Sequence, residues 1–202
     1  MKAATTFSSL TGELTQPPLD LVQDADMVSN AKTNLKKMAD LEATAYHEAG
    51  HAVAAFQLGI RIGRRGVSII PAKDGSLGLV DILKGFRGRP DIMTSDRMRL
   101  GAEKQAIVSF VGEIAQRKFR PRSVRRDHGW SDRYKTADLM GYFVATDKEL
   151  RAYLKWLHIR AELFVSSPYN WSLIEAVAAM LLERKRLSAE EVKDICLTVS
   201  RG

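Results

Sequence analysis

The segment Leu41–Gly59, LEATAYHEAGHAVAAFQLG, constrains the fold more than any other part of the chain. Its apolar residues recur at helical spacing on one face, at Ala45, Ala49, Val53 and Phe56. Asp40 before the segment is a residue type that caps helices, and Gly59 is a natural C-terminal stop. The pattern predicts a buried helix from Asp40 to Gly59, against which the rest of the chain must pack.

The residues after this helix predict one β-hairpin followed by about five helices. The apolar runs VSIIP (67–71) and SLGLVDIL (76–83) are separated by the turn signal Lys73-Asp74-Gly75. Residues 84–91, KGFRGRPD, are typical of a loop. Helical periodicity and capping residues predict the helices at 95–119, 132–144, 146–167, 171–187 and 188–199. We therefore expect a mainly helical α+β domain with a small hairpin after the first buried helix.

Length and composition indicate an ordinary globular protein. The chain has 202 residues, of which 45% are hydrophobic and 27% charged, enough for a single core. Residues 1–38 show no sustained period and are expected to form a flexible tail, leaving 39–202 as the domain. No apolar stretch reaches the roughly 20 residues of a membrane span, and the N-terminus lacks a signal-peptide pattern. With Cys196 as its single cysteine, a cytoplasmic location is expected.

The motif His47-Glu48-Ala49-Gly50-His51 lies inside the first buried helix. Two histidines four residues apart project from one helix face, so both imidazoles can reach one metal ion. Zn²⁺ suits such a site because catalytic zinc keeps three protein ligands and one open position for water. Glu48 is placed to take a proton from that water. The chemistry indicated is zinc-assisted amide hydrolysis, with Glu48 as the general base.

A third metal ligand must come from elsewhere in the chain. The acidic and histidine side chains after the motif are candidates, and spacing alone leaves them open: Asp127, His128, Asp132 and Asp138, with Glu149 and His158 further away. Asp132 lies at an expected helix N-terminus, where a negative charge is also favourable for the helix itself.

Several segments resemble the peptidase domain of FtsH-type membrane AAA proteases. The similar segments run from about Ala39 to Cys196, namely AYHEAGHAV (45–53), VSIIP (67–71), SLGLV (76–80), VGEIA (111–115), GWSD (129–132), LLERKRL (181–187) and AEEV (189–192). In that family the zinc helix is followed by a strand ending in Ile-Pro and then by a small-Leu-Gly segment. The resemblance implies a zincin-like helical domain with metallopeptidase activity.

The resemblance also implies roles for particular residues. The family's third zinc ligand is the aspartate of a Gly-Ala-Ser-Asn-Asp segment, which corresponds to Asp132. The asparagine is missing here, and the spacing from the aspartate to the following alanine is one residue longer than in the family. The family's substrate-binding strand corresponds to Ser76, Leu77, Gly78, Leu79 and Val80. An exposed strand edge there can hold an extended peptide by main-chain hydrogen bonds. The same residues are also consistent with a purely structural hairpin.

The chain lacks the phosphate-binding loop G-x-x-x-x-G-K-[ST] of the family's ATPase domain. We therefore expect a zinc metalloendopeptidase that cuts peptides or unfolded protein segments, or that receives substrates from a separate delivery partner or ATPase. Because the family works in rings, a homo-oligomer is a further expectation. The alternative is a catalytically silent, zinc-containing binding or adaptor module.

The chain is basic, with a net charge of +7 and six basic residues in RKFRPRSVRR (117–126). Such a run can attract nucleic acid, an anionic surface or acidic substrates and partners, or can simply be a solvated loop. No helix-turn-helix pattern, zinc-finger spacing or aromatic-interleaved basic strand accompanies it, so no nucleic-acid partner is expected.

Overall fold

The computed structural model describes residues 19–71, 77–87, 89–124 and 130–201. It separates into two units, Met1–Lys37 and Met38–Gly202. The helix α1, Leu19–Leu58, contains residues of both units. The account below concerns the second unit, which carries every side chain of the candidate site.

Helix α1 begins 21 residues earlier than the sequence pattern indicates, at Leu19 instead of Asp40. Apolar periodicity reports which residues are buried, and residues 33–38 are exposed, so the pattern could not detect these residues as helical. Nothing between Leu19 and Asp40 breaks a helix, because the segment contains neither proline nor glycine. The expected end is confirmed: the helix stops at Leu58 and Gly59 adopts a left-handed φ of 70°.

The hairpin is confirmed, but its first strand is Ile62–Ser68 and not the expected 67–71, because the first half of the strand carries the exposed Arg64 and Arg65 and forms no apolar run. The sheet also has a third strand that the sequence analysis missed. Strand β1 spans Ile62–Ser68, β2 spans Leu79–Ile82 and β3 spans Arg186–Leu187, in the order β2-β1-β3. Both pairings are antiparallel, with Val67 opposite Val80 on one side and opposite Leu187 on the other. Strand β2 therefore has one side unpaired within the described sheet. Lys73-Asp74-Gly75, the expected turn, lies outside the described residues.

The helices that follow the hairpin match the predicted number. They are α2 (Asp96–Phe119), α3 (Trp130–Gly141), α4 (Asp147–Ser166), α5 (Pro168–Arg184) and α6 (Ala189–Val199), with a 3-10 turn η1 at Pro121–Ser123. The capping box at Ser188 and Glu191 is present. The expected boundaries of two helices are wrong at both ends: α3 spans Trp130–Gly141 instead of 132–144, and α5 spans Pro168–Arg184 instead of 171–187. Helix α5 ends at Arg184 because Lys185 turns the chain with a φ of 65° into β3.

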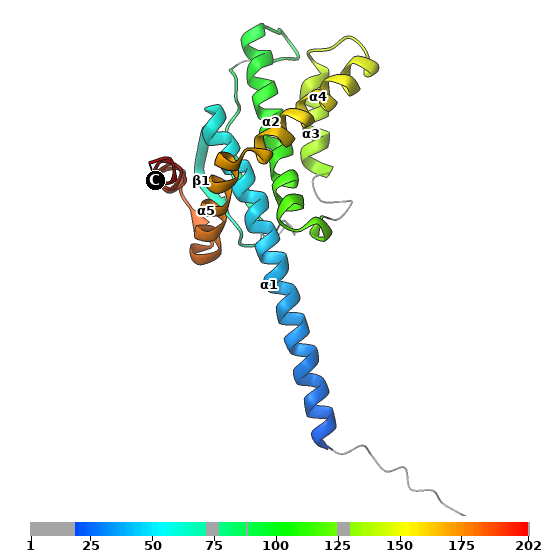
Figure 1. The fold of residues 1–202 in the computed structure, drawn as a ribbon. Coiled ribbons are helices and arrows are strands. Elements are labelled where there is room, and N and C mark those ends of the chain that lie inside the picture. Colours follow the sequence, from blue (N-terminus) through cyan, green and yellow to red (C-terminus); the bar gives the residue numbers. More distant parts are fainter. Residues whose placement is uncertain (1–18, 72–76, 88, 125–129, 202) are drawn as a thin grey trace, which may run out of the picture. The chain divides into compact units, whose positions relative to one another are not determined.

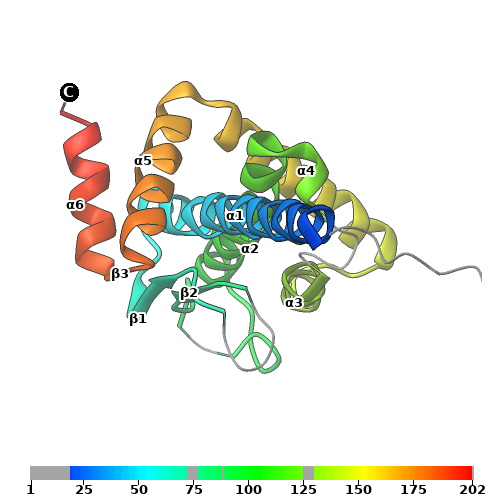
Figure 2. The same cartoon turned by 90° about the horizontal axis from the view of Figure 1, so that it is seen from below.

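The core of the second unit consists of two hydrophobic clusters that both include α1. One cluster packs Ala45, Ala49 and Val53 against the sheet, α5 and α6, and the other packs Ala54 and Ala55 against α2, α3 and α4. Figures 1 and 2 show the arrangement, with α5 and α6 on one side of α1 and α2 to α4 on the other. The fold is thus α+β and mainly helical, as predicted. Among the described residues, no helix is long and apolar enough to cross a membrane.

Helices α1 and α2 cross closely at Gly50. A Cβ added to Gly50 would lie 2.9 Å from the Cβ of Ala115 and 3.1 Å from the carbonyl oxygen of Val111. The absence of a side chain at this position lets the two backbones approach. The crossing lies between His47 and His51 in sequence, so it brings α2 beside both imidazoles.

Candidate metal centre

His47 and His51 lie one turn apart on α1, as their spacing predicts, and their rings meet edge to face. The Nε2 atoms of the two rings are 3.1 Å apart. Two nitrogens bound to one tetrahedral zinc ion at about 2.0–2.1 Å would lie roughly 3.3 Å from each other. The separation in the structure is therefore close to that of two ligands on one ion.

Contacts from α2 and η1 set the direction of both rings. The carbonyl oxygen of Val108 accepts from Nδ1 of His51 at 2.8 Å. Nδ1 of His47 lies 3.0 Å from Oε1 of Gln116, whose amide nitrogen donates to the carbonyl and hydroxyl oxygens of Ser123. Because the amide oxygen of Gln116 and the main-chain oxygen can only accept, both histidines carry their proton on Nδ1.

This tautomer leaves two Nε2 lone pairs pointing at the same space. Two lone pairs 3.1 Å apart repel each other unless a cation lies between them. A metal ion meets that requirement, as would a proton shared between the rings. Metal-binding histidines commonly donate their other N–H to a carbonyl or carboxylate, which is the arrangement seen here.

Asp132 completes a group of three ligands. It lies in the first turn of α3, and its Oδ2 is 3.8 Å from Nε2 of His51. One ligand atom from each of His47, His51 and Asp132 lies within 4.8 Å of the others, so the group can bind a metal ion. His51 is 8% exposed, whereas the side chain of Asp132 is 37% exposed. The group is therefore buried at His51 and reaches solvent at Asp132.

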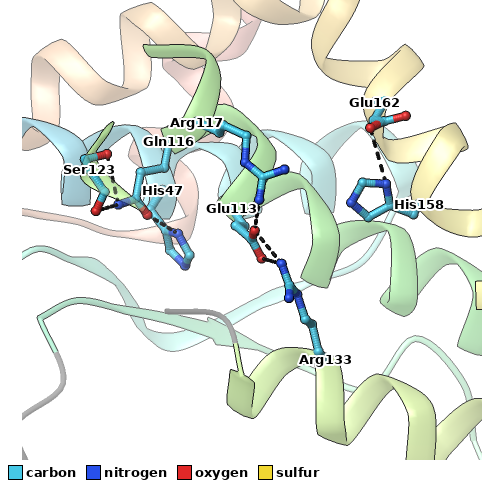
Figure 3. A network of polar contacts seen from close by, with 8 residues as sticks. All are labelled: His47, Glu113, Gln116, Arg117, Ser123, Arg133, His158 and Glu162. Atoms are coloured by element: carbon cyan, nitrogen blue, oxygen red, sulfur yellow. Dashed lines mark hydrogen bonds and ion pairs between the residues drawn. The ribbon is translucent and has the colours of Figure 1, made fainter. Parts of the chain in front are cut away.

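The buried carboxylate of Glu113 ties the start of α3 to α2. Both carboxylate oxygens accept from Nη2 of Arg133, at 2.5 and 2.6 Å, and Arg117 on α2 donates to the same carboxylate. Figure 3 shows Glu113 between the two arginines, beside the Gln116–His47 pair. Arg133 follows Asp132 directly in sequence. The ion pair therefore restrains the segment that supplies the third ligand.

Glu48 lies beside this group and not in it. The residue is 7% exposed, and a Cβ added at Gly78 would overlap its carboxylate, so the backbone before β2 approaches the carboxylate closely. Burial, together with the negative charge of Asp132, raises the pKa of Glu48 to about 8. A carboxylate with a raised pKa can accept a proton and later return it near neutral pH.

Gly112 has no side chain, and the imidazole of His51 occupies the space where one would lie. A Cβ at this position would overlap Nε2, Cε1 and Cδ2 of the imidazole. The residue lies in the middle of α2, where glycine weakens a helix by about 1 kcal/mol relative to alanine. The close approach of the ring explains why a glycine is present.

The other candidate ligands are not part of the group among the residues that the structure describes. Asp138 lies exposed two turns further along α3. Glu149 accepts from the main-chain N–H of Ala145 near the start of α4, and His158 on α4 is 3.4 Å from Glu162 (Figure 3). Asp127 and His128 lie outside the described residues.

The expected substrate segment starts outside the described residues, since Ser76 is not described. Leu77 is exposed, Gly78 approaches Glu48, and Leu79 and Val80 belong to the edge strand β2. In the basic run 117–126, Arg117 pairs with Glu113 and Arg120 lies 3.8 Å from Glu42. Arg125 and Arg126 lie outside the described residues.

Sequence reasoning missed the residues that support the ligands, namely Val108, Gln116, Glu113 and Arg133. A main-chain acceptor such as that of Val108 has no sequence signal. The spacing of Glu113 and Arg117 is that of a helical ion pair, but nothing local shows that Arg133 joins it.

Comparison of the sequence with known protein families and with curated proteins finds no match. The ligand group and its surroundings are therefore interpreted from their own chemistry.

Proposed function

We propose that the protein is a zinc-dependent endopeptidase that hydrolyses peptides or unfolded protein segments. The observation that carries the proposal is the position of Glu48, a buried carboxylate beside three convergent metal ligands. A purely structural zinc site is closed by four protein ligands and has no use for such a group. Three ligands with an adjacent proton acceptor are typical of hydrolytic sites.

The chain's own residues supply the proton transfers and the substrate contacts. A bound zinc ion would polarise the peptide carbonyl and lower the pKa of the attacking water to about 7. Glu48 takes one proton from that water as the water oxygen bonds to the carbonyl carbon. It then gives the proton to the amide nitrogen as the C–N bond breaks, so that an acid and an amine are formed. His47, His51 and Asp132 would hold the ion.

The edge strand β2 is a reason to expect a substrate that binds in an extended conformation. Its unpaired side within the described sheet offers main-chain donors and acceptors to a further strand, and Gly78 just before it lies against Glu48. Most segments of a folded protein are not free to pair in this way, because their main-chain groups are already bonded within the fold. We therefore propose that substrates are unfolded or are delivered by a separate partner or ATPase, and a homo-oligomer remains part of the proposal.

Metal content and cleavage of an unfolded casein-type substrate test the proposal together. We expect the wild-type protein to bind about one zinc ion and to cut the substrate. Glu48→Gln should keep the zinc and lose at least a hundredfold in rate. Asp132→Ala should lose both, whereas Asp138→Ala, on the same helix and outside the ligand group, should lose neither.

The outcome that contradicts the proposal is zinc binding without cleavage by the wild-type protein on any unfolded substrate. The binding-module alternative would then be the better description. Failure to bind any divalent ion would exclude both.

A further inference from the structure

A cavity of about 230 Å³ opens beside the ligand group. His51 and Asp132 form part of its wall, strands β1 and β2 contribute Arg65, Val80 and Ile82, and further residues of α2 and α3 complete it. The volume is far above the roughly 30 Å³ of one water molecule and below the roughly 300–1,000 Å³ of sites for drug-sized ligands. A cavity of this size next to a hydrolytic centre fits one side chain of a bound peptide.

Within the described part of the chain, the charges around the cavity leave one cation without an ion-pair partner. Nη2 of Arg65 is 3.3 Å from Oδ1 of Asp81, so these two lining residues compensate each other. Asp132 belongs to the metal ligands. Lys135, one turn further along α3, also lines the cavity and has no ion-pair partner among the described residues.

The remaining walls combine apolar and polar surface. Val80, Ile82 and Leu139 can contact the methylene groups of an incoming side chain, while Thr136 offers a hydroxyl group. The hydroxyl of Ser109 already donates to the carbonyl oxygen of Gln105. Thr136 is only 3% exposed, so its side chain is held in place by packing. An apolar stem with a negative end is the side chain that suits this lining.

We propose that the cavity is a specificity site for an acidic substrate side chain, glutamate above all, next to the bond that is cut. Lys135 is the specificity-determining residue, because its ammonium group pairs with the substrate carboxylate. The inference rests on the proposed peptidase function and adds a substrate class to it.

The test uses matched peptides with acetylated and amidated ends, so that no terminal carboxylate is present. The peptides differ only in carrying Glu, Gln or Lys at one of the two positions that flank the cleaved bond. At low ionic strength we expect the wild-type kcat/KM for the Glu peptide to be about threefold or more above that for the Gln peptide at one of the two positions. The difference between the Glu and Lys peptides should be larger. The preference should shrink as salt is added.

Lys135→Glu should reverse the preference toward Lys without loss of bound zinc. Lys148→Glu is the matched control, since it makes the same change in net charge on an exposed residue of α4 that does not line the cavity. It should keep the wild-type preference.

Cleavage with equal kcat/KM for Glu and Gln, or an unchanged preference in Lys135→Glu, overturns the cavity inference and leaves the peptidase proposal standing. A second set of the same peptides with a free C-terminal carboxylate is run beside them. Cleavage of this second set alone also overturns the inference, because the bound carboxylate would then be that of the chain end. If the wild-type protein cuts none of the peptides nor unfolded casein, the peptidase proposal fails and the cavity inference falls with it.

Discussion

Two glycines set how closely the backbone approaches the chemical groups of the site. Gly112 faces the imidazole of His51, and Gly78 faces the carboxylate of Glu48. In both cases a single methyl group would occupy space that a functional atom holds. The identity of these residues is therefore part of the site although neither offers a ligand.

Gly112→Ala should lower zinc affinity at least tenfold, because the new Cβ overlaps Nε2 of His51 and forces the ring away from its partners. The measurement is a competition titration against a chromophoric chelator. Gly141→Ala is the control, since a Cβ there meets nothing within 4 Å. Wild-type zinc affinity in Gly112→Ala would contradict this account of the glycine.

At this scale the sequence predicts some site residues and misses others for a physical reason. His47 and His51 follow from helical spacing and Glu48 from the motif that contains them, because all three are on one element. Gln116 contacts His47 across 69 positions of sequence. No local pattern encodes that contact, since it exists only once α1 and α2 have packed.

At the scale of elements, α2 holds the ligands of two other helices. It places Val108 behind His51, Gln116 behind His47, and Glu113 against Arg133 beside Asp132. Ligands from α1 and α3 thus share one support. The alignment of α3 on α2 decides whether the third ligand reaches the other two.

Arg133→Gln should weaken zinc binding by roughly tenfold while far-ultraviolet circular dichroism stays unchanged. The reason is that loss of the ion pair to the buried Glu113 releases the start of α3, which carries Asp132. In a cobalt-substituted sample, the visible absorption bands should become weaker as the tetrahedral ligand set loosens.

Arg117→Gln is the control for this ion pair. It removes the other partner of Glu113, but Arg117 lies on α2 itself and does not connect α3. Equal losses of zinc affinity in the two variants would show that the charge balance at Glu113, and not the attachment of α3, is what matters.

The elements also show where local sequence signals end. Capping residues mark the starts of α2, α4 and α6, because their side chains bond to main-chain groups only three residues away. Strand β3 has two residues and owes its existence to pairing with β1, about 120 residues earlier in the chain. Such a strand has no period of its own to detect.

At the scale of the whole molecule, the ligands connect elements from both hydrophobic clusters. The histidines are on α1, which both clusters include, and α3 belongs to one of them. An ion bound by all three ligands is bound only when these parts have packed. Metal binding and global stability are therefore expected to be linked.

Zinc at a hundred times its dissociation constant should stabilise the protein by about 2.7 kcal/mol, which corresponds to a rise in Tm of roughly 5–11 °C. Differential scanning calorimetry with zinc, and then with excess chelator, measures the rise and its reversal. Asp132→Ala should show no such rise. A zinc-independent Tm in the wild-type protein would mean that the ligand group does not hold the ion in the folded state.

The two histidines differ in what mutation can change. The acceptor behind His51 is a main-chain oxygen, which every amino acid at position 108 would supply. The orientation of this ring therefore depends on how α1 and α2 cross and not on the side chain at position 108. The acceptor behind His47 is the side chain of Gln116, which one substitution can exchange for a carboxylate or remove. Natural variation in metal affinity among descendants of this chain would therefore be expected to accumulate at position 116.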